Sequence, residues 1–161
     1  MEYNDLTHGL FGARDPKGMP THLFFGASHI DYATAERANT SKQNYSACPR
    51  HWYVDASFVC AACGSAFVFK ASEQRFWYEE LRFWIDSLPK CCPKCRQSQR
   101  ARLELRKRYE ASIGEALGPC SLEAKQQVVA TINELEAAGD EIPDRMRENR
   151  ATLLAQICKK G

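Results

Sequence analysis

The sequence has no long apolar run, and residues that interrupt regular structure are few. No stretch of the 161 residues approaches the roughly 18 consecutive apolar residues that a membrane-spanning helix requires. The first ten residues lack a basic start followed by an apolar segment, so we expect no secretory signal and a cytoplasmic protein. Nine glycines and seven prolines are too few for a low-complexity chain. A hydrophobic fraction of 44% excludes wholesale disorder.

Signals of catalysis are also missing. The four histidines, His8, His22, His29 and His51, follow no metal-ligand or triad spacing. No glycine-rich phosphate loop is present. We therefore expect a non-enzymatic binding module with no small-molecule substrate and no membrane partner.

Cysteine, in contrast, is abundant and clustered. Five of the eight cysteines fall in two tight groups. They are Cys60 and Cys63 in the first group, and Cys91, Cys92 and Cys95 in the second. Disulfides are disfavoured in the reducing compartment expected here, so the clusters indicate a metal site. Cys48, Cys120 and Cys158 are interpreted as small core residues.

Two Cys-x-x-Cys pairs, Cys60–Cys63 and Cys92–Cys95, are separated by 28 residues. Each pair can hold one ion through a tight turn, with sulfurs about 2.3 Å from the metal, and Gly64 allows the positive φ that the first turn needs. Four thiolates complete a tetrahedron and leave no position for a substrate, so the pattern predicts one structural zinc ion per chain. Cys91 is the alternative to Cys92, which is preferred because it keeps the two-residue gap.

Iron is the alternative metal, because four soft thiolates suit both ions. The Cys60–Gly64 segment followed by Cys92-Pro-Lys-Cys95 is similar to the rubredoxin arrangement, which would imply an electron carrier. However, Arg96 stands where a rubredoxin has glycine, and the long basic helix that follows is foreign to that family. Zinc is therefore the preferred cofactor.

The middle third of the chain predicts a hairpin followed by a helix. Aromatic and β-branched residues at 51–59 and 66–70 favour two strands on either side of the Cys60–Gly64 turn. Residues 73–87 predict a helix with Ser72 as its N-cap. The aromatic residues of this region are interpreted as core rather than as base-stacking platforms. They are Trp52, Tyr53, Phe58, Phe67, Phe69, Phe76, Trp77 and Trp84.

The two ends of the chain predict different structures. Residues 1–47 predict a loop-rich arm interrupted by glycine and proline, with one short helical turn at 32–37. Residues 93–117 predict a long helix, which a helical hairpin follows. Its first arm is expected at about 122–138, and its second arm, after Gly139 and Pro143, carries Met146, Leu153, Leu154 and Ile157. The predicted fold class is α+β, with a zinc ribbon at 48–100 between the arm and a helical tail at 101–161.

Five segments of the middle third carry a family resemblance. They are Trp52–Asp55, Cys60–Gly64, Phe67–Lys70, Glu73–Phe76 and Pro89–Arg96. In this order they resemble a bacterial family called the probable zinc-ribbon domain, over about residues 48–100. The resemblance implies the ligands Cys60, Cys63, Cys92 and Cys95, and a Glu73-Gln74 element that caps the helix between the two pairs. It implies no established activity.

Charge is concentrated in one segment. The net charge is only +2, yet residues 90–108 hold eight basic residues and a single acidic one. The candidate contact residues of the basic helix at 94–108 are Lys94, Arg96, Arg100, Arg102, Arg106, Lys107 and Arg108. Such a helix suits a phosphate backbone, so the predicted partner is nucleic acid or a nucleoprotein assembly. One alternative is a solvated helix whose cations pair with acids of the tail. Another is an adaptor or inhibitor that binds a protein through the helical tail and exposed aromatics.

Overall fold

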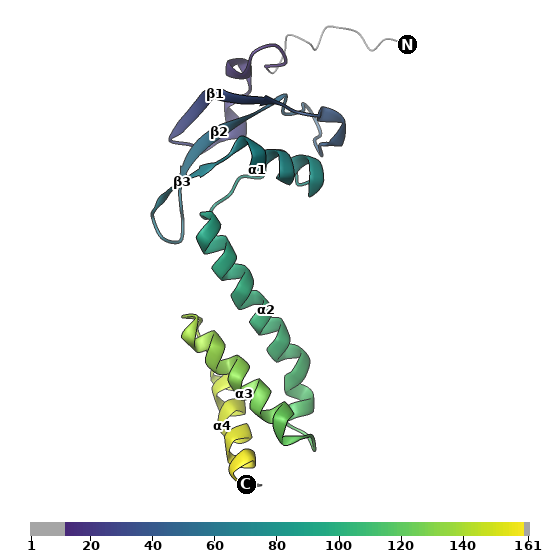
Figure 1. The fold of residues 1–161 in the computed structure, drawn as a ribbon, viewed down its shortest axis with the longest axis vertical. Coiled ribbons are helices and arrows are strands. Elements are labelled where there is room, and N and C mark those ends of the chain that lie inside the picture. Colours follow the sequence, from purple (N-terminus) through teal and green to yellow (C-terminus); the bar gives the residue numbers. More distant parts are fainter. Residues whose placement is uncertain (1–11, 160–161) are drawn as a thin grey trace. The chain divides into compact units, whose positions relative to one another are not determined.

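The computed structural model describes residues 12–159, and the chain divides into two compact units after Cys92 (Figure 1). The first unit contains a three-stranded antiparallel sheet and a short helix, and the second contains three helices. The predicted α+β class is therefore confirmed. None of the described helices is long and apolar enough to cross a membrane.

The sheet has the order β1-β2-β3, formed by His29–Arg37, Trp52–Val59 and Ala66–Phe69. The hairpin of β2 and β3 confirms the two strands predicted around the cysteine turn. The expectation of an irregular arm is wrong over β1, and the helical turn expected at 32–37 is wrong because those residues belong to this strand. Pairing with β2 stabilises β1. Because this pairing joins residues that are far apart in the sequence, no local sequence pattern predicts it.

Three short 3-10 helices precede or connect these strands, at Pro16–Gly18, Thr21–Phe24 and Thr40–Lys42. After β3, α1 spans Ala71–Arg75 and continues as a π-helical turn over Phe76–Glu80. The helix predicted at 73–87 is thus shorter than expected.

Two residues define the limits of this short helix. It begins because the amide of Ala71 donates a hydrogen bond to Asp55 Oδ1 at 2.7 Å, so Ser72 is not the N-cap. It ends before Arg82, which adopts a left-handed backbone conformation with φ 54°. Asp55 of β2 therefore caps the start of α1, in place of the helix's own Ser72, which the sequence predicted.

A polar network lies inside the first unit. The Arg50 guanidinium is fully buried and donates to the carbonyl oxygens of Leu23 at 2.6 Å and Ile85 at 3.2 Å. It also donates to Oε1 of the fully buried Gln74 at 3.3 Å. The Gln74 amide in turn donates to the carbonyl of Val54. Gln74 therefore joins α1 to the sheet, which differs from the capping role implied by the resemblance.

The aromatic residues that were interpreted as core divide into three groups. Trp52, Phe67 and Trp77 are partly buried and pack against the core of the first unit. Tyr53, Phe58 and Phe69 are buried in its core, as interpreted from the sequence. Phe76 and Trp84 are exposed, so the core interpretation is wrong for these two. Both lie in or just after the π-helical turn, where the expected helix does not continue.

The described part of the second unit contains α2 (Pro93–Ala116), α3 (Leu122–Ala137) and α4 (Asp144–Cys158). The first two lie close to the predicted bounds, and α4 contains the residues expected in the second arm of the hairpin. Gly139, with φ 72°, ends α3 as predicted, and the next amide donates to the carbonyl of Leu135 at 3.1 Å. This is the hydrogen-bond pattern of a helix that ends in a left-handed residue.

The helices pack around an aliphatic core that includes Ile132, Leu135 and Leu153, each fully buried. Lys125 is buried although it is charged, and its ammonium group donates to three oxygens at 2.7–2.8 Å. Two of the three acceptors are carbonyls at the end of α2, so Lys125 closes the helix terminus. Cys158 is exposed, against the expectation of a core cysteine, whereas Cys48 is buried.

Candidate metal centre and basic helix

The first cysteine pair lies in the turn between β2 and β3. The amide of Cys60 donates to the carbonyl of Ser65 at 2.9 Å, and the amide of Gly64 donates to the carbonyl of Cys60 at 2.9 Å. Gly64 has φ 72°, as the turn was predicted to require. Apart from Gly64 itself and its two neighbours in the chain, no heavy atom of the described residues lies within 4 Å of the position that a Cβ would occupy on Gly64, so backbone conformation alone favours glycine there.

The second pair lies where α2 begins. Cys92 directly precedes the helix, and Cys95 is the third residue within it. The amide of Cys92 donates to Cys60 Sγ at 3.2 Å, and the amide of Ala61 donates to the carbonyl of Lys90 at 2.9 Å. These two backbone contacts hold the segment before α2 against the hairpin turn.

The four sulfurs that the spacing selected form one cluster. The sulfur atoms of Cys60, Cys63, Cys92 and Cys95 all lie within 4.8 Å of one another, and Cys63 Sγ is 3.9 Å from Cys92 Sγ. Sulfurs bound about 2.3 Å from a tetrahedral ion lie about 3.8 Å apart, so the cluster fits such an ion. Cys91 does not belong to the cluster.

Cys60 is prepared to act as a thiolate. Hydrogen bonding from the Cys92 amide lowers the pKa of the Cys60 thiol to about 6, and this outweighs burial, which would raise it. A thiolate is the form of cysteine that binds metal ions. The arrangement of the backbone amides therefore favours metal binding at neutral pH.

The basic residues of α2 fall into two sets. Towards the end of the basic helix, Arg106 pairs with Asp140 at 2.6 Å, Lys107 with Glu104 at 2.9 Å, and Arg108 with Glu134 at 3.7 Å. These three cations match the expectation of a solvated helix paired with acids.

The other set lies in the first half of α2. Lys94, Arg100 and Arg102 form no ion pair with the described residues, and Lys94 and Arg100 are exposed. Arg96 is half-buried. The apolar contacts of α2 with α3 and α4 begin only at Leu105, so the first half of α2 extends beyond the core of its own unit (Figure 1).

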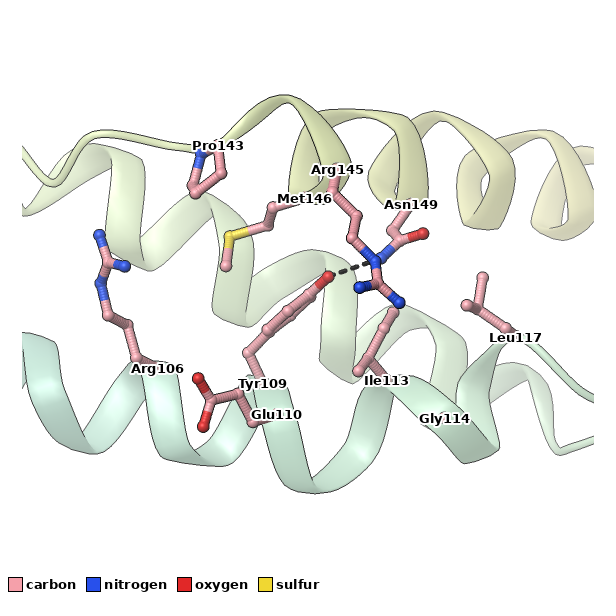
Figure 2. Close-up of a pocket in the computed structure, with 10 residues that line it drawn as sticks. All are labelled: Arg106, Tyr109, Glu110, Ile113, Gly114, Leu117, Pro143, Arg145, Met146 and Asn149. Atoms are coloured by element: carbon pink, nitrogen blue, oxygen red, sulfur yellow. Dashed lines mark hydrogen bonds between the residues drawn. The ribbon is translucent and has the colours of Figure 1, made fainter.

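A cavity of about 400 Å³ lies between α2 and α4 (Figure 2). Asn149 Nδ2 of α4 donates to the Tyr109 hydroxyl of α2 at 2.7 Å, and the apolar side chains of Ile113 and Met146 also line the space. Within residues 12–159, the four cysteines are the only group of three or more potential metal ligands. None of these cysteines lines the cavity, so the cavity is not part of the metal centre.

A cysteine pair in a β-hairpin turn and a second pair at the start of a helix define a metal-binding domain of the treble clef type. A family described as a probable treble clef domain matches residues 54–104. This family is zinc-ribbon-like, so the resemblance seen in the sequence is confirmed over this segment. No curated protein and no solved structure matches the chain.

The ligand set and the turn glycine were visible in the sequence, whereas the supporting contacts were not. The hydrogen bond from Cys92 to the Cys60 sulfur and the contact between Ala61 and Lys90 use backbone amides. Backbone groups are the same in every residue, so no residue type marked them. The Cys-Gly ending of the first pair was the only local signal of this geometry.

Proposed function

We propose that the four cysteines hold one structural zinc ion and that the first half of α2 binds nucleic acid. The four-thiolate donor set supports zinc, because it fills every position of a tetrahedral ion and leaves none for a substrate. Elemental analysis of untagged protein tests this part. We expect about one zinc per chain, and a stoichiometric red iron species would contradict zinc.

The observation that carries the nucleic-acid proposal is the set of unpaired cations in the first half of α2. Lys94 and Arg100 form no ion pair among the described residues, and Arg102 acts on Asp140 only at longer range, whereas the cations nearer the end of the basic helix form ion pairs. An unpaired cation on an exposed helix can neutralise a phosphate and release its counterion. The proposed contact surface is therefore the first half of α2, and not the whole basic helix at 94–108 that was predicted from the sequence.

A fluorescence anisotropy titration with a 20-nucleotide RNA and with a duplex DNA tests the contact. We expect the double variant Lys94→Glu, Arg100→Glu to weaken binding at least tenfold. Each lost phosphate contact with a duplex reduces the slope of log K against log salt by about 0.9. Lys94→Glu and Arg100→Glu are also measured singly, and Arg147→Glu is their matched control because it makes the same charge change as each single variant on α4, where Arg147 already pairs with Asp144.

Two outcomes would reject the nucleic-acid contact. One is the absence of binding by the zinc-loaded wild-type chain at low salt. The other is an equal loss of affinity in Arg147→Glu, which would indicate that net charge alone decides binding. Zinc content measured on every variant separates a folding defect from a lost contact.

A further inference from the structure

The aromatic turn, residues 76–84, exposes four large apolar side chains that neither the metal centre nor the nucleic-acid proposal uses. Phe76, Leu81, Phe83 and Trp84 are 52%, 45%, 43% and 40% exposed. A single exposed apolar residue is ordinary, but several in one short segment are typical of a contact surface. The aromatic turn is therefore the strongest unassigned surface of the first unit.

Packing beneath the aromatic turn holds it in one conformation. Tyr78 is fully buried, and its hydroxyl donates to the carbonyl of Ser87 at 2.6 Å. The ring of Trp77 meets the ring of Phe83 edge-on, with centroids 5.4 Å apart. Side chains held in this way lose little conformational freedom when a partner binds.

The backbone of the aromatic turn has two unusual features. The amide of Leu81 donates to the carbonyl of Phe76 at 3.0 Å, which closes a π-helical turn. Arg82 adopts a positive φ, a conformation that is strained for residues other than glycine. π-helical turns and strained residues are found preferentially at functional sites. Both features here coincide with the exposed apolar residues.

Charge indicates which class of partner the aromatic turn suits. Residues 76–86 contain three carboxylates and a single basic residue, Arg82. Each of these carboxylates already has a partner, because Glu79 accepts a hydrogen bond from the Asn39 amide, Glu80 pairs with Lys42, and Asp86 accepts a hydrogen bond from the Trp84 indole. Arg82 is exposed, follows Leu81, precedes Phe83, and forms no ion pair within the part of the chain that the structure describes. Aromatic residues and arginine are enriched at protein interfaces.

We propose that the aromatic turn is a docking site for an apolar protein segment that carries a carboxylate. In this arrangement the partner's apolar side chains pack against Phe76 and Phe83, and its carboxylate pairs with Arg82. The proposal is independent of nucleic-acid binding, because it involves a different surface, which lies in the first unit and not on α2.

The test uses a phage-displayed library of random 12-residue peptides, panned against the full zinc-loaded chain. We expect the selected peptides to share two apolar side chains near an Asp or Glu. The best peptide, synthesised with a fluorophore, should lose at least tenfold in affinity with Phe76→Ser or Phe83→Ser. It should lose a similar factor with Arg82→Glu, and a peptide with Lys in place of the carboxylate should recover binding to that variant. Leu103→Ser, at an exposed leucine of α2, is the matched control and should change nothing.

Three results would overturn the proposal. The first is that no peptide is enriched, or that the enriched peptide binds Phe76→Ser as tightly as the wild type. The second is a wild-type dimer in sedimentation that Phe76→Ser dissociates, since the occupant would then be a second copy. The third is a loss of RNA affinity in Phe76→Ser equal to that of the α2 charge reversals. Zinc content and tryptophan emission establish that each variant is folded.

Discussion

The two units of this chain differ in what they bury. The unit that ends at Cys92 encloses Arg50 and Gln74 among aromatic rings, with the cysteine cluster at its boundary with α2. The unit that starts at Pro93 encloses mostly aliphatic side chains, and the one buried charge among its described residues, Lys125, closes a helix end. The first unit therefore depends on specific polar contacts, and the second on apolar packing of helices.

This difference predicts how each unit responds to damage. Buried polar groups cost free energy when they lose a partner, whereas apolar packing loses free energy in proportion to the atoms removed. The two units can be followed separately in one sample. Trp52, Trp77 and Trp84, the only tryptophans, all lie in the first unit, whereas the helices of 24, 16 and 15 residues all lie in the second.

Metal removal is expected to have the largest effect, and mainly on the first unit, which holds three of the four ligands. Structural zinc contributes about 10 kcal/mol or more to the folding of small domains. A strong chelator, or Cys63→Ser at an exposed ligand, should shift tryptophan emission to the red while most of the ellipticity at 222 nm remains. Cys158→Ser, an exposed cysteine outside the cluster, is the control. Unchanged emission after complete loss of metal would show that the first unit does not need the ion.

Loss of apolar packing in the second unit should come next. Leu153 is fully buried, so Leu153→Ala should lower the free energy of unfolding by about 3 kcal/mol through lost contacts and a residual cavity. Urea unfolding followed at 222 nm measures this change, and tryptophan emission should show an unaltered transition. Leu154→Ala, at the exposed neighbour, should change stability little. A parallel shift of both probes would show that the two units unfold together.

The same contrast explains which parts of the fold the sequence predicts. The bounds of α2, α3 and α4 follow from local signals, namely an apolar repeat of helical period and the stops at Gly118-Pro119 and Gly139. The ligand set follows from the spacing of two Cys-x-x-Cys pairs. Both kinds of signal lie within a few residues of the structure they predict.

The parts that were missed depend on contacts between distant residues. β1 is stabilised by pairing with β2 and carries an irregularity between Asp31 and Glu36 that hides the alternating pattern of a strand. Arg50 carries the charge of a typical surface residue, and only the placement of Leu23 and Ile85 around it makes burial possible. Neither fact has a local signal in the sequence.

Replacement of Arg50 tests how much the buried polar contacts stabilise the first unit. Arg50→Met removes a buried charge whose hydrogen bonds go to two carbonyls and an amide oxygen, which recovers some desolvation cost. It also leaves three buried oxygens without this donor, at about 1–3 kcal/mol for each that stays unpaired. We expect net destabilisation of about 2 kcal/mol, seen as an earlier transition of tryptophan emission in urea. A variant as stable as the wild type would show that desolvation of Arg50 cancels its hydrogen bonds.

The smallest expected effect concerns a single ion pair in the second unit. Arg106 lowers the pKa of Asp140 through a hydrogen bond, so the pair stabilises the fold above about pH 4 and loses that contribution as the pH falls further. The Arg106 side chain is 39% exposed, so the loss in Asp140→Asn should be only about 0.5 kcal/mol at pH 7. Urea unfolding at 222 nm should show this difference at pH 7 and nearly none at pH 3. Glu104→Gln is the control, because Glu104 forms an exposed pair within one helix, and it should change stability less than Asp140→Asn at either pH. An equal effect of the two variants would mean that Asp140 has no special role in joining α2 to the turn after α3.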